Sequence, residues 1–165
     1  MSTVDQFRTQ TRRWLGANRP PSQRKGIPEG EMVWGAREME FPSADAQVWF
    51  ERMRDKGWFC PEWPVEYGGA GLSDEYNAVL ESELRRLKCR PPQINLGIWM
   101  LGPVLLEFGT EAQKKQLLTP MTRGEVRWCQ GFSEPNAGSD LASLKTSARD
   151  AGDNFVVDGS KIWTS

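Results

Sequence analysis

The residue types best suited to chemistry lie in two short segments near the end of the chain, residues 131–140 (GFSEPNAGSD) and residues 159–165 (GSKIWTS). Ser133 offers a hydroxyl and a backbone N–H. Gly138, followed by Ser139, lets the backbone approach an anionic group with no Cβ in the way. Trp163 offers a broad aromatic face, and Ser165 offers a second hydroxyl. These groups suit a flat, polar-edged ring that carries a diphosphate, although residue types alone do not name such a ligand.

The chain contains no histidine, which excludes the Ser-His-Asp and Cys-His systems of nucleophilic catalysis. Its cysteines, Cys60, Cys89 and Cys129, are odd in number and widely spaced. This pattern is typical of a reducing compartment and does not form a structural zinc site. We therefore expect no metal site, and chemistry that depends on carboxylates or on a cofactor.

The charge pattern argues against two classes of partner. The 21 basic and 22 acidic side chains give a formal net charge of -1, with no basic block for neutralising phosphates, so we expect no nucleic-acid binding. No apolar run approaches the length of about 18 residues that crosses a bilayer, so we expect no membrane partner. The polar N-terminus lacks the apolar core of a signal peptide. The prediction is a cytoplasmic protein.

Helical patterns dominate the chain up to about residue 125. Apolar residues recur at helical spacing, and caps and breakers predict helices over residues 4–15, 43–57, 73–87, 95–108 and 110–118. Thr110 and Gln113 form a capping box, and Pro103 should start or kink the fourth helix. Residues 21–42 are punctuated by Gly and Pro and should be irregular. Gly68 to Gly71 should be a loop that leads into a helix, because no G-x-G-x-x-G spacing follows a strand there.

The pattern changes at the end of this region. Residues 126–132, 144–149 and 154–158 are strand candidates, and Asp158-Gly159 predicts a hairpin between residues 155–157 and 161–164. The predicted fold class is therefore α+β: an all-α domain at residues 1–125, followed at 126–165 by the first strands of an antiparallel β domain. Strands without a partner sheet are poorly stabilised, so we expect the sequence to be the N-terminal part of a longer protein.

Several segments together resemble one family. Residues 133–140 resemble a flavin-binding motif of the acyl-CoA dehydrogenases, Thr/Ser-Glu-Pro-x-Ala-Gly-Ser-Asp, and residues 148–159 resemble the family's hairpin between its two flavin contacts. Residues 61–73 and 108–125 resemble its N-terminal helical domain. The match covers residues 45 to 165 in the expected order. The resemblance implies that this chain is the helical N-terminal domain and the incomplete middle β domain of such an enzyme, without its C-terminal helical domain.

The resemblance also implies a cofactor, FAD, and its contact residues: Gln130, Phe132, Ser133, Gly138, Ser139, Trp163, Thr164 and Ser165. Ser133 would hydrogen-bond the isoalloxazine ring, Trp163 would pack against it, and Ser139 would also meet the substrate. The family usually has a small aliphatic residue at the position of Phe132, so the shape of the pocket stays open. Ser165 replaces the family's usual threonine and keeps the hydroxyl.

The implied function is FAD-dependent α,β-dehydrogenation of an acyl-CoA thioester. In this family the base is a glutamate of the C-terminal domain, so residues 1–165 should contain no catalytic residue. The implied partners are an acyl-CoA substrate, an electron-transfer flavoprotein or another electron acceptor, and further subunits in a homotetramer or heterotetramer.

Two alternatives to this function stay open: a non-catalytic partner subunit of a heteromeric acyl-CoA dehydrogenase, and a flavin oxidase or monooxygenase on the same fold. The choice between fatty acyl and steroid substrates is also open. Glu134 precedes Pro135 within a turn, so we expect it to accept backbone hydrogen bonds and not to act as a base. For Trp128 we expect a place in the core.

Overall fold

The computed structural model describes residues 2–24, 26–28 and 30–164. The chain divides into two compact units, residues 1–127 (unit 1) and residues 128–165 (unit 2). Unit 1 is helical and unit 2 contains a two-stranded antiparallel sheet, so the predicted α+β class is confirmed. None of the helices in the described part of the chain is both long and apolar enough to cross a membrane.

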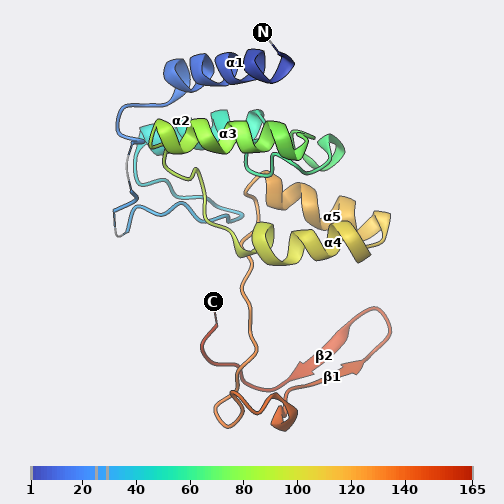
Figure 1. The fold of residues 1–165 in the computed structure, drawn as a ribbon. Helices are drawn as coiled ribbons and strands as arrows, with labels where there is room; N and C mark the ends of the chain where they lie inside the picture. Colours follow the sequence, from blue (N-terminus) through green and yellow to red (C-terminus); the bar gives the residue numbers. More distant parts are fainter. Residues whose placement is uncertain (1, 25, 29, 165) are drawn as a thin grey trace. The chain divides into compact units, whose positions relative to one another are not determined.

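The described residues of unit 1 contain five α-helices (Figure 1): α1 (Thr3–Asn18), α2 (Ala44–Asp55), α3 (Asp74–Arg86), α4 (Gly102–Phe108) and α5 (Glu111–Thr122). Side-chain oxygens of Ser43 and Thr110 cap α2 and α5, and Thr110 forms the predicted capping box with Gln113. The predicted fourth helix is divided into a π-helical turn, η2 (Gly97–Leu101), and α4, and Pro103 lies in the first turn of α4, as predicted. α5 also runs beyond residue 118 and accommodates Pro120 in its last turn.

The irregular parts of unit 1 follow the predictions. Residues 21–42 contain no helix or strand among those described. The segment that contains Gly68 to Gly71 is a loop between a short 3-10 turn, η1 (Val65–Tyr67), and α3. Gly68 has φ 90 at the end of η1, a left-handed conformation that glycine adopts without steric cost.

Large apolar side chains form the core of unit 1. Leu15, Trp49 and Phe50 are completely buried, and Met53 and Leu80 are nearly so. They come from α1, α2 and α3, the three helices that lie together in Figure 1. Burying a side chain of this size removes enough apolar surface from water to stabilise the fold by about 1.5–3 kcal/mol.

A buried carboxylate joins α1 to α3. Glu83 of α3 is 1% exposed and accepts hydrogen bonds from Arg12 of α1 at 2.8 and 3.0 Å and from Arg86 at 2.8 Å. The hydrogen bond from Arg12, followed by that from Arg86, lowers the pKa of Glu83 from 4.5 to about 2. The carboxylate is therefore ionised at neutral pH and holds α1 against α3.

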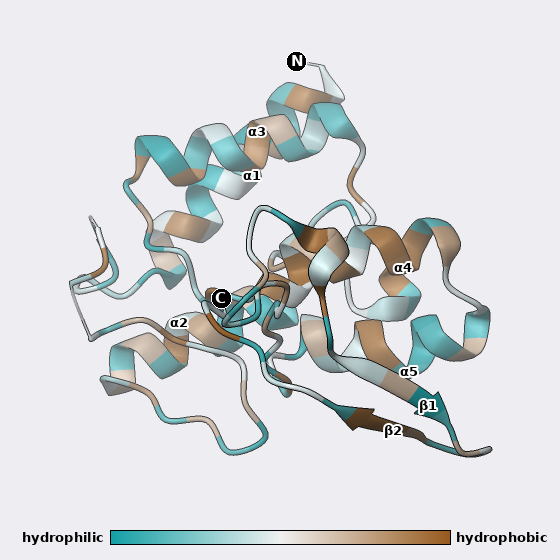
Figure 2. Ribbon diagram, turned by 90° about the horizontal axis from the view of Figure 1, so that it is seen from below, coloured by the Kyte–Doolittle hydropathy of each residue, from teal (hydrophilic) through white to brown (hydrophobic). Residues whose placement is uncertain are grey.

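Unit 2 contains a hairpin of two short strands. β1 (Ser147–Asp150) pairs antiparallel with β2 (Phe155–Asp158), with Ala148 opposite Val157. All residues of both strands are exposed, including the apolar run Phe155–Val157, which gives β2 its brown colour in Figure 2. A short 3-10 turn, η3 (Leu141–Ser143), precedes the hairpin.

Two strand predictions were wrong. Residues 126–132 are extended but pair with no strand in the described part of the chain, so they are not part of a sheet. The predicted hairpin between residues 155–157 and 161–164 does not form, because β2 pairs with β1 through the turn at Gly152. Residues 161 and 162 instead bond to Phe132 and Ser133.

Candidate functional site

The two segments singled out from the sequence lie side by side within unit 2. The backbone N–H of Ile162 donates to the carbonyl oxygen of Ser133 at 2.9 Å. The Lys161 Nζ donates to the carbonyl oxygen of Phe132 at 3.0 Å. These bonds hold the residues around Ser133 next to those around Trp163, although about thirty residues of chain separate them. A ligand can therefore contact both segments at once.

Glu134 is the polar centre of unit 2. Its carboxylate is 7% exposed and accepts hydrogen bonds from the backbone N–H groups of Lys145 at 2.7 Å and Thr146 at 2.9 Å, and from Lys161 Nζ at 2.9 Å. Hydrogen bonds from Thr146, then from the Lys145 amide and Lys161, lower the pKa of Glu134 from 4.5 to about 2. The prediction that this residue accepts backbone hydrogen bonds is confirmed.

The predicted contact residues differ in exposure. Gln130 and Ser133 are half-buried, whereas Phe132, Gly138, Ser139, Trp163 and Thr164 are exposed. Ser165, also predicted to contact the cofactor, lies outside the described residues. Trp128, expected in a core, is half-buried and belongs to unit 2.

Trp163 has an unusual conformation. Its φ is 54, in the left-handed region that a bulky residue rarely adopts, and its side chain is 84% exposed. Strain of this kind persists only when neighbouring contacts hold the backbone, and it occurs most often at functional sites. The residues just before Trp163 supply such contacts, because Lys161 and Ile162 are both bonded to the 132–134 segment.

These residues fit a flavin. The exposed indole of Trp163 can cover one face of a flat ring, and the hydroxyl and N–H of Ser133 can donate to the polar edge of the ring. An added Cβ at Gly138 would meet nothing within 4 Å, so this backbone is open to a diphosphate. The donor set therefore suits FAD on both counts.

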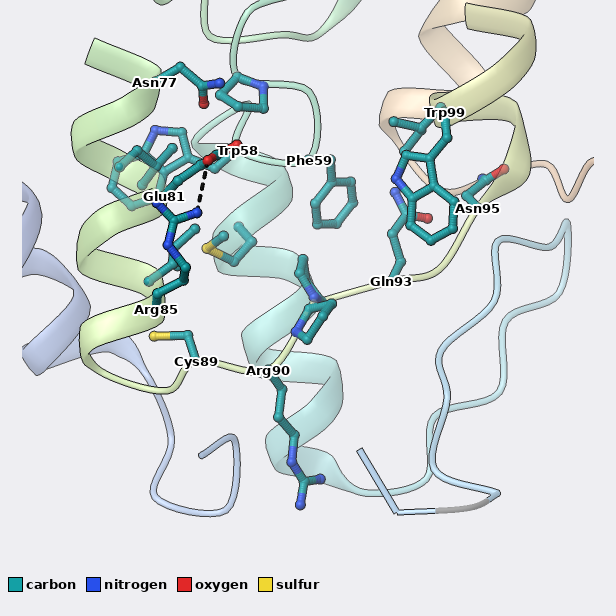
Figure 3. A pocket seen from close by; sticks show the side chains of 17 residues that line it. Trp58, Phe59, Asn77, Glu81, Arg85, Cys89, Arg90, Gln93, Asn95 and Trp99 are labelled. Carbon is teal, nitrogen blue, oxygen red and sulfur yellow. Dashed lines mark hydrogen bonds and ion pairs between the residues drawn. The ribbon is translucent and has the colours of Figure 1, made fainter. Parts of the chain in front are cut away.

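Unit 1 contains a separate cavity of about 380 Å³ (Figure 3). Trp58 and Phe59 line it together with Gln93 and Trp99, which lie opposite α3. Its lining is mainly apolar, and the charged side chains of Glu81 and Arg85 pair with each other at 3.0 Å. Arg90 also lines the cavity and pairs with Glu31 at 2.7 Å, and burial raises the pKa of the lining Cys89 thiol, so this thiol is not an activated nucleophile. The mainly apolar lining suits a neutral apolar group.

Comparison with known proteins identifies the family. The family description "Acyl-CoA dehydrogenase, N-terminal domain" matches residues 5–125. This chain belongs to the acyl-CoA dehydrogenase family. The acyl-CoA dehydrogenase IpdE1 of Mycobacterium tuberculosis is 38% identical over 168 residues, which cover 100% of this chain and 42% of the relative.

Solved structures agree with this assignment. The steroid acyl-CoA dehydrogenase Tcur3481-Tcur3483 is similar with a TM-score of 0.60 and 32% identity, over 98% of this chain and 39% of that one. The ChsE4-ChsE5 complex from Mycobacterium tuberculosis gives a TM-score of 0.61 and 29% identity, over 100% of this chain and 39% of the other. The chain thus spans about two fifths of the length of these relatives.

The sequence reasoning did not single out Lys161. No periodicity links it to Glu134, which lies 27 residues earlier. A lysine two residues before an exposed tryptophan also carries no local signal, because most lysines lie on solvated surfaces. Only the folded arrangement of unit 2 shows that the Lys161 ammonium joins the two segments.

Proposed function

We propose that this chain supplies part of the FAD-binding surface of an enzyme that dehydrogenates an acyl-CoA thioester between its α and β carbons. The observation that carries the proposal is the hydrogen bond from Ile162 N–H to the Ser133 carbonyl, together with that from Lys161 to the Phe132 carbonyl. They place an aromatic face and a donor group on neighbouring segments. In domain terms, we assign residues 1–125 to the helical domain and residues 126–165 to the start of the middle β domain.

Each residue has a specific role in this proposal. FAD, when bound, supplies the hydride acceptor for this chemistry. The indole of Trp163 covers the ring, and the donors of Ser133 stabilise the negative charge that reduction places on its polar edge. The open backbone at Gly138 and Ser139 receives the anionic part of the cofactor, and Ser139 also meets the acyl-CoA. Gln130, Phe132, Thr164 and Ser165 complete the proposed contacts.

The substrate and the assembly are also proposals. The relatives named as a steroid acyl-CoA dehydrogenase and as the ChsE4-ChsE5 complex support a bulky acyl group and a partner of unlike sequence. In the same scheme, electrons leave through an electron-transfer flavoprotein or a comparable acceptor. The alternative of a non-catalytic partner subunit predicts a bound flavin that no thioester reduces.

The first experiment tests catalysis. The protein is expressed from its complete reading frame and titrated anaerobically with acyl-CoA thioesters of several lengths and with a steroid acyl-CoA. We expect the flavin absorbance, at about 450 nm, to fall with the right substrate. A flavoprotein that no thioester reduces would rule out the dehydrogenase and support the non-catalytic subunit. Reduction followed by rapid reaction with oxygen would support the oxidase.

A second experiment tests the cofactor contact. Replacing Trp163 by alanine should weaken FAD binding about tenfold, because stacking on an aromatic side chain contributes about 1–3 kcal/mol per ring. The matched control is Trp99→Ala, which removes an exposed tryptophan of unit 1. Equal FAD affinity in the Trp163→Ala variant and the wild-type protein would show that Trp163 does not contact the cofactor.

A further inference from the structure

We propose that Lys161 is a positioning residue that holds the two flavin-contacting segments in register, with Glu134 as its anchor. This inference rests on the proposed function, because register matters only if one ligand contacts both segments. The ammonium of Lys161 fixes the positions of Ser133 and Trp163 relative to each other. It does not itself contact the reacting atoms.

The contacts of Lys161 support this role. Its half-buried side chain carries Nζ to the carbonyl oxygen of Phe132 at 3.0 Å and to Oε1 of Glu134 at 2.9 Å. The next residue, Ile162, bonds to the carbonyl of Ser133. The Lys161 side chain therefore bonds to residues 132 and 134, and the Ile162 backbone bonds to residue 133 between them. Such paired contacts fix both the distance and the register of the segments.

Glu134 is a rigid anchor because other parts of unit 2 hold it in place. The N–H groups of Lys145 and Thr146, just before β1, donate to its two carboxylate oxygens. Glu134 also exchanges both backbone hydrogen bonds with Ala137, at 2.8 and 3.0 Å. A carboxylate with this many donors has little rotational freedom, so the position of Lys161 follows from that of Glu134.

The bonds of Lys161 and Ile162 account for the left-handed backbone conformation of Trp163. A left-handed φ at a bulky residue relaxes unless its neighbours hold it, and the bonds of Lys161 and Ile162 are such restraints close in the sequence. Loss of the ammonium would leave the Glu134 carboxylate with two amide donors, so the turn would stay folded. The segment leading to Trp163 would lose both bonds of the lysine and, among the described contacts, keep its backbone bond to Ser133. The expected defect is a misplaced indole within a folded unit.

The test compares three variants for FAD affinity and for the absorption spectrum and reduction potential of the bound flavin. Lys161→Met keeps the length of the side chain and removes its charge. We expect it to weaken FAD binding about tenfold, as the loss of a charge-assisted hydrogen bond implies, and to shift the spectrum and potential. Lys161→Arg keeps both donors and should restore most of the affinity. Lys145→Met, which removes an exposed side chain and leaves the backbone donor to Glu134 unchanged, should behave as wild type.

Two results would overturn the inference: a Lys161→Met protein with wild-type affinity, spectrum and potential, or an equal loss in the Lys145→Met control. A wild-type protein that binds no FAD would instead refute the proposed function. In that case the positioning claim is tested by hydrogen exchange at the Ile162 amide. Unchanged protection of this amide in Lys161→Met would overturn it, whereas faster exchange would support it.

Discussion

Unit 1 buries Trp49 and Phe50 completely, whereas unit 2 leaves Phe155 69% exposed and buries the carboxylate of Glu134 instead. Two apolar clusters therefore hold the first unit together: one joins α1, α2 and α3, and the other surrounds Phe50 with residues of the irregular segments. Hydrogen bonds to a single side chain and one short hairpin organise the second. Apolar burial is the main favourable term in folding, and a net hydrogen bond contributes much less. The comparison indicates that most of the stability of this chain resides in unit 1, and that unit 2 carries the candidate site.

The largest expected effect tests the core of unit 1. Phe50→Ala removes a completely buried ring that packs against Phe41 and Phe59, so we expect it to lower the free energy of unfolding by about 3–5 kcal/mol. Urea denaturation followed by near-UV circular dichroism measures this change. A loss below about 1 kcal/mol would show that α2 does not provide the core.

The next effect tests the polar contact within unit 1. Glu83→Gln should cost about 2 kcal/mol, because hydrogen bonds to charged groups contribute about 1.5–3 kcal/mol and the arginines can turn towards water. The control is Glu81→Gln, whose exposed pair with Arg85 should contribute about 0.3–0.5 kcal/mol. Equal effects of the two variants would contradict the buried contact between α1 and α3.

The stabilisation by Glu83 should also depend on pH. The pKa of folded Glu83 is about 2, below its ordinary 4.5, so the unfolded chain takes up this proton first as the pH falls. The stabilisation by Glu83 is complete above pH 4.5 and is lost between pH 4.5 and about pH 2. The difference in stability between wild type and Glu83→Gln should shrink across this range, and a constant difference would contradict the assignment.

A smaller effect tests the hairpin of unit 2. Gly152 has φ 87 at the turn between the strands, so Gly152→Ala should cost about 1 kcal/mol of backbone strain although the added Cβ meets no atom within 4 Å. The amide of Ala151, bonded to the Asn154 carbonyl at 2.9 Å, should exchange its hydrogen faster. Gly138→Ala, with equally open space and no positive φ, is the control and should leave this exchange unchanged.

The smallest expected effect tests the exposed surface of unit 2. Phe155→Ala should change the free energy of unfolding by no more than about 0.5 kcal/mol, because its ring lies mostly in water. The measurement is the urea denaturation used for Phe50→Ala. A loss similar to that of Phe50→Ala would show that the hairpin is packed in solution, and would remove the contrast between the units.

Local patterns predicted the helices well, because helix formation depends on neighbours three and four residues apart. The helical spacing of apolar residues predicted α3, and the capping box of Thr110 and Gln113 predicted the start of α5. The strand pairing was less predictable, since Gly152-Asp153 and Asp158-Gly159 both have turn chemistry. Local sequence could not decide between the two hairpins.

The candidate site was predictable in part. The residue types of 131–140 and 159–165 indicated an aromatic face, donors and an open backbone, and these contacts to a cofactor stay predictions. The place of Lys161 and the pairing of Glu83 with Arg12 and Arg86 were not predictable, because a charged residue carries no sequence signal for burial.

The sequence by itself determined the family and the helical character of residues 1–125, and it supplied the residue types of the two motif segments. Only the tertiary structure decided which strands pair, which carboxylates are buried, and that Ile162 and Lys161 bring Trp163 beside Ser133. The physical reason is the separation of the interacting residues along the sequence. Helical periods, caps and turns are encoded within a few residues, whereas contacts between residues 27 to 71 positions apart depend on how the whole unit closes.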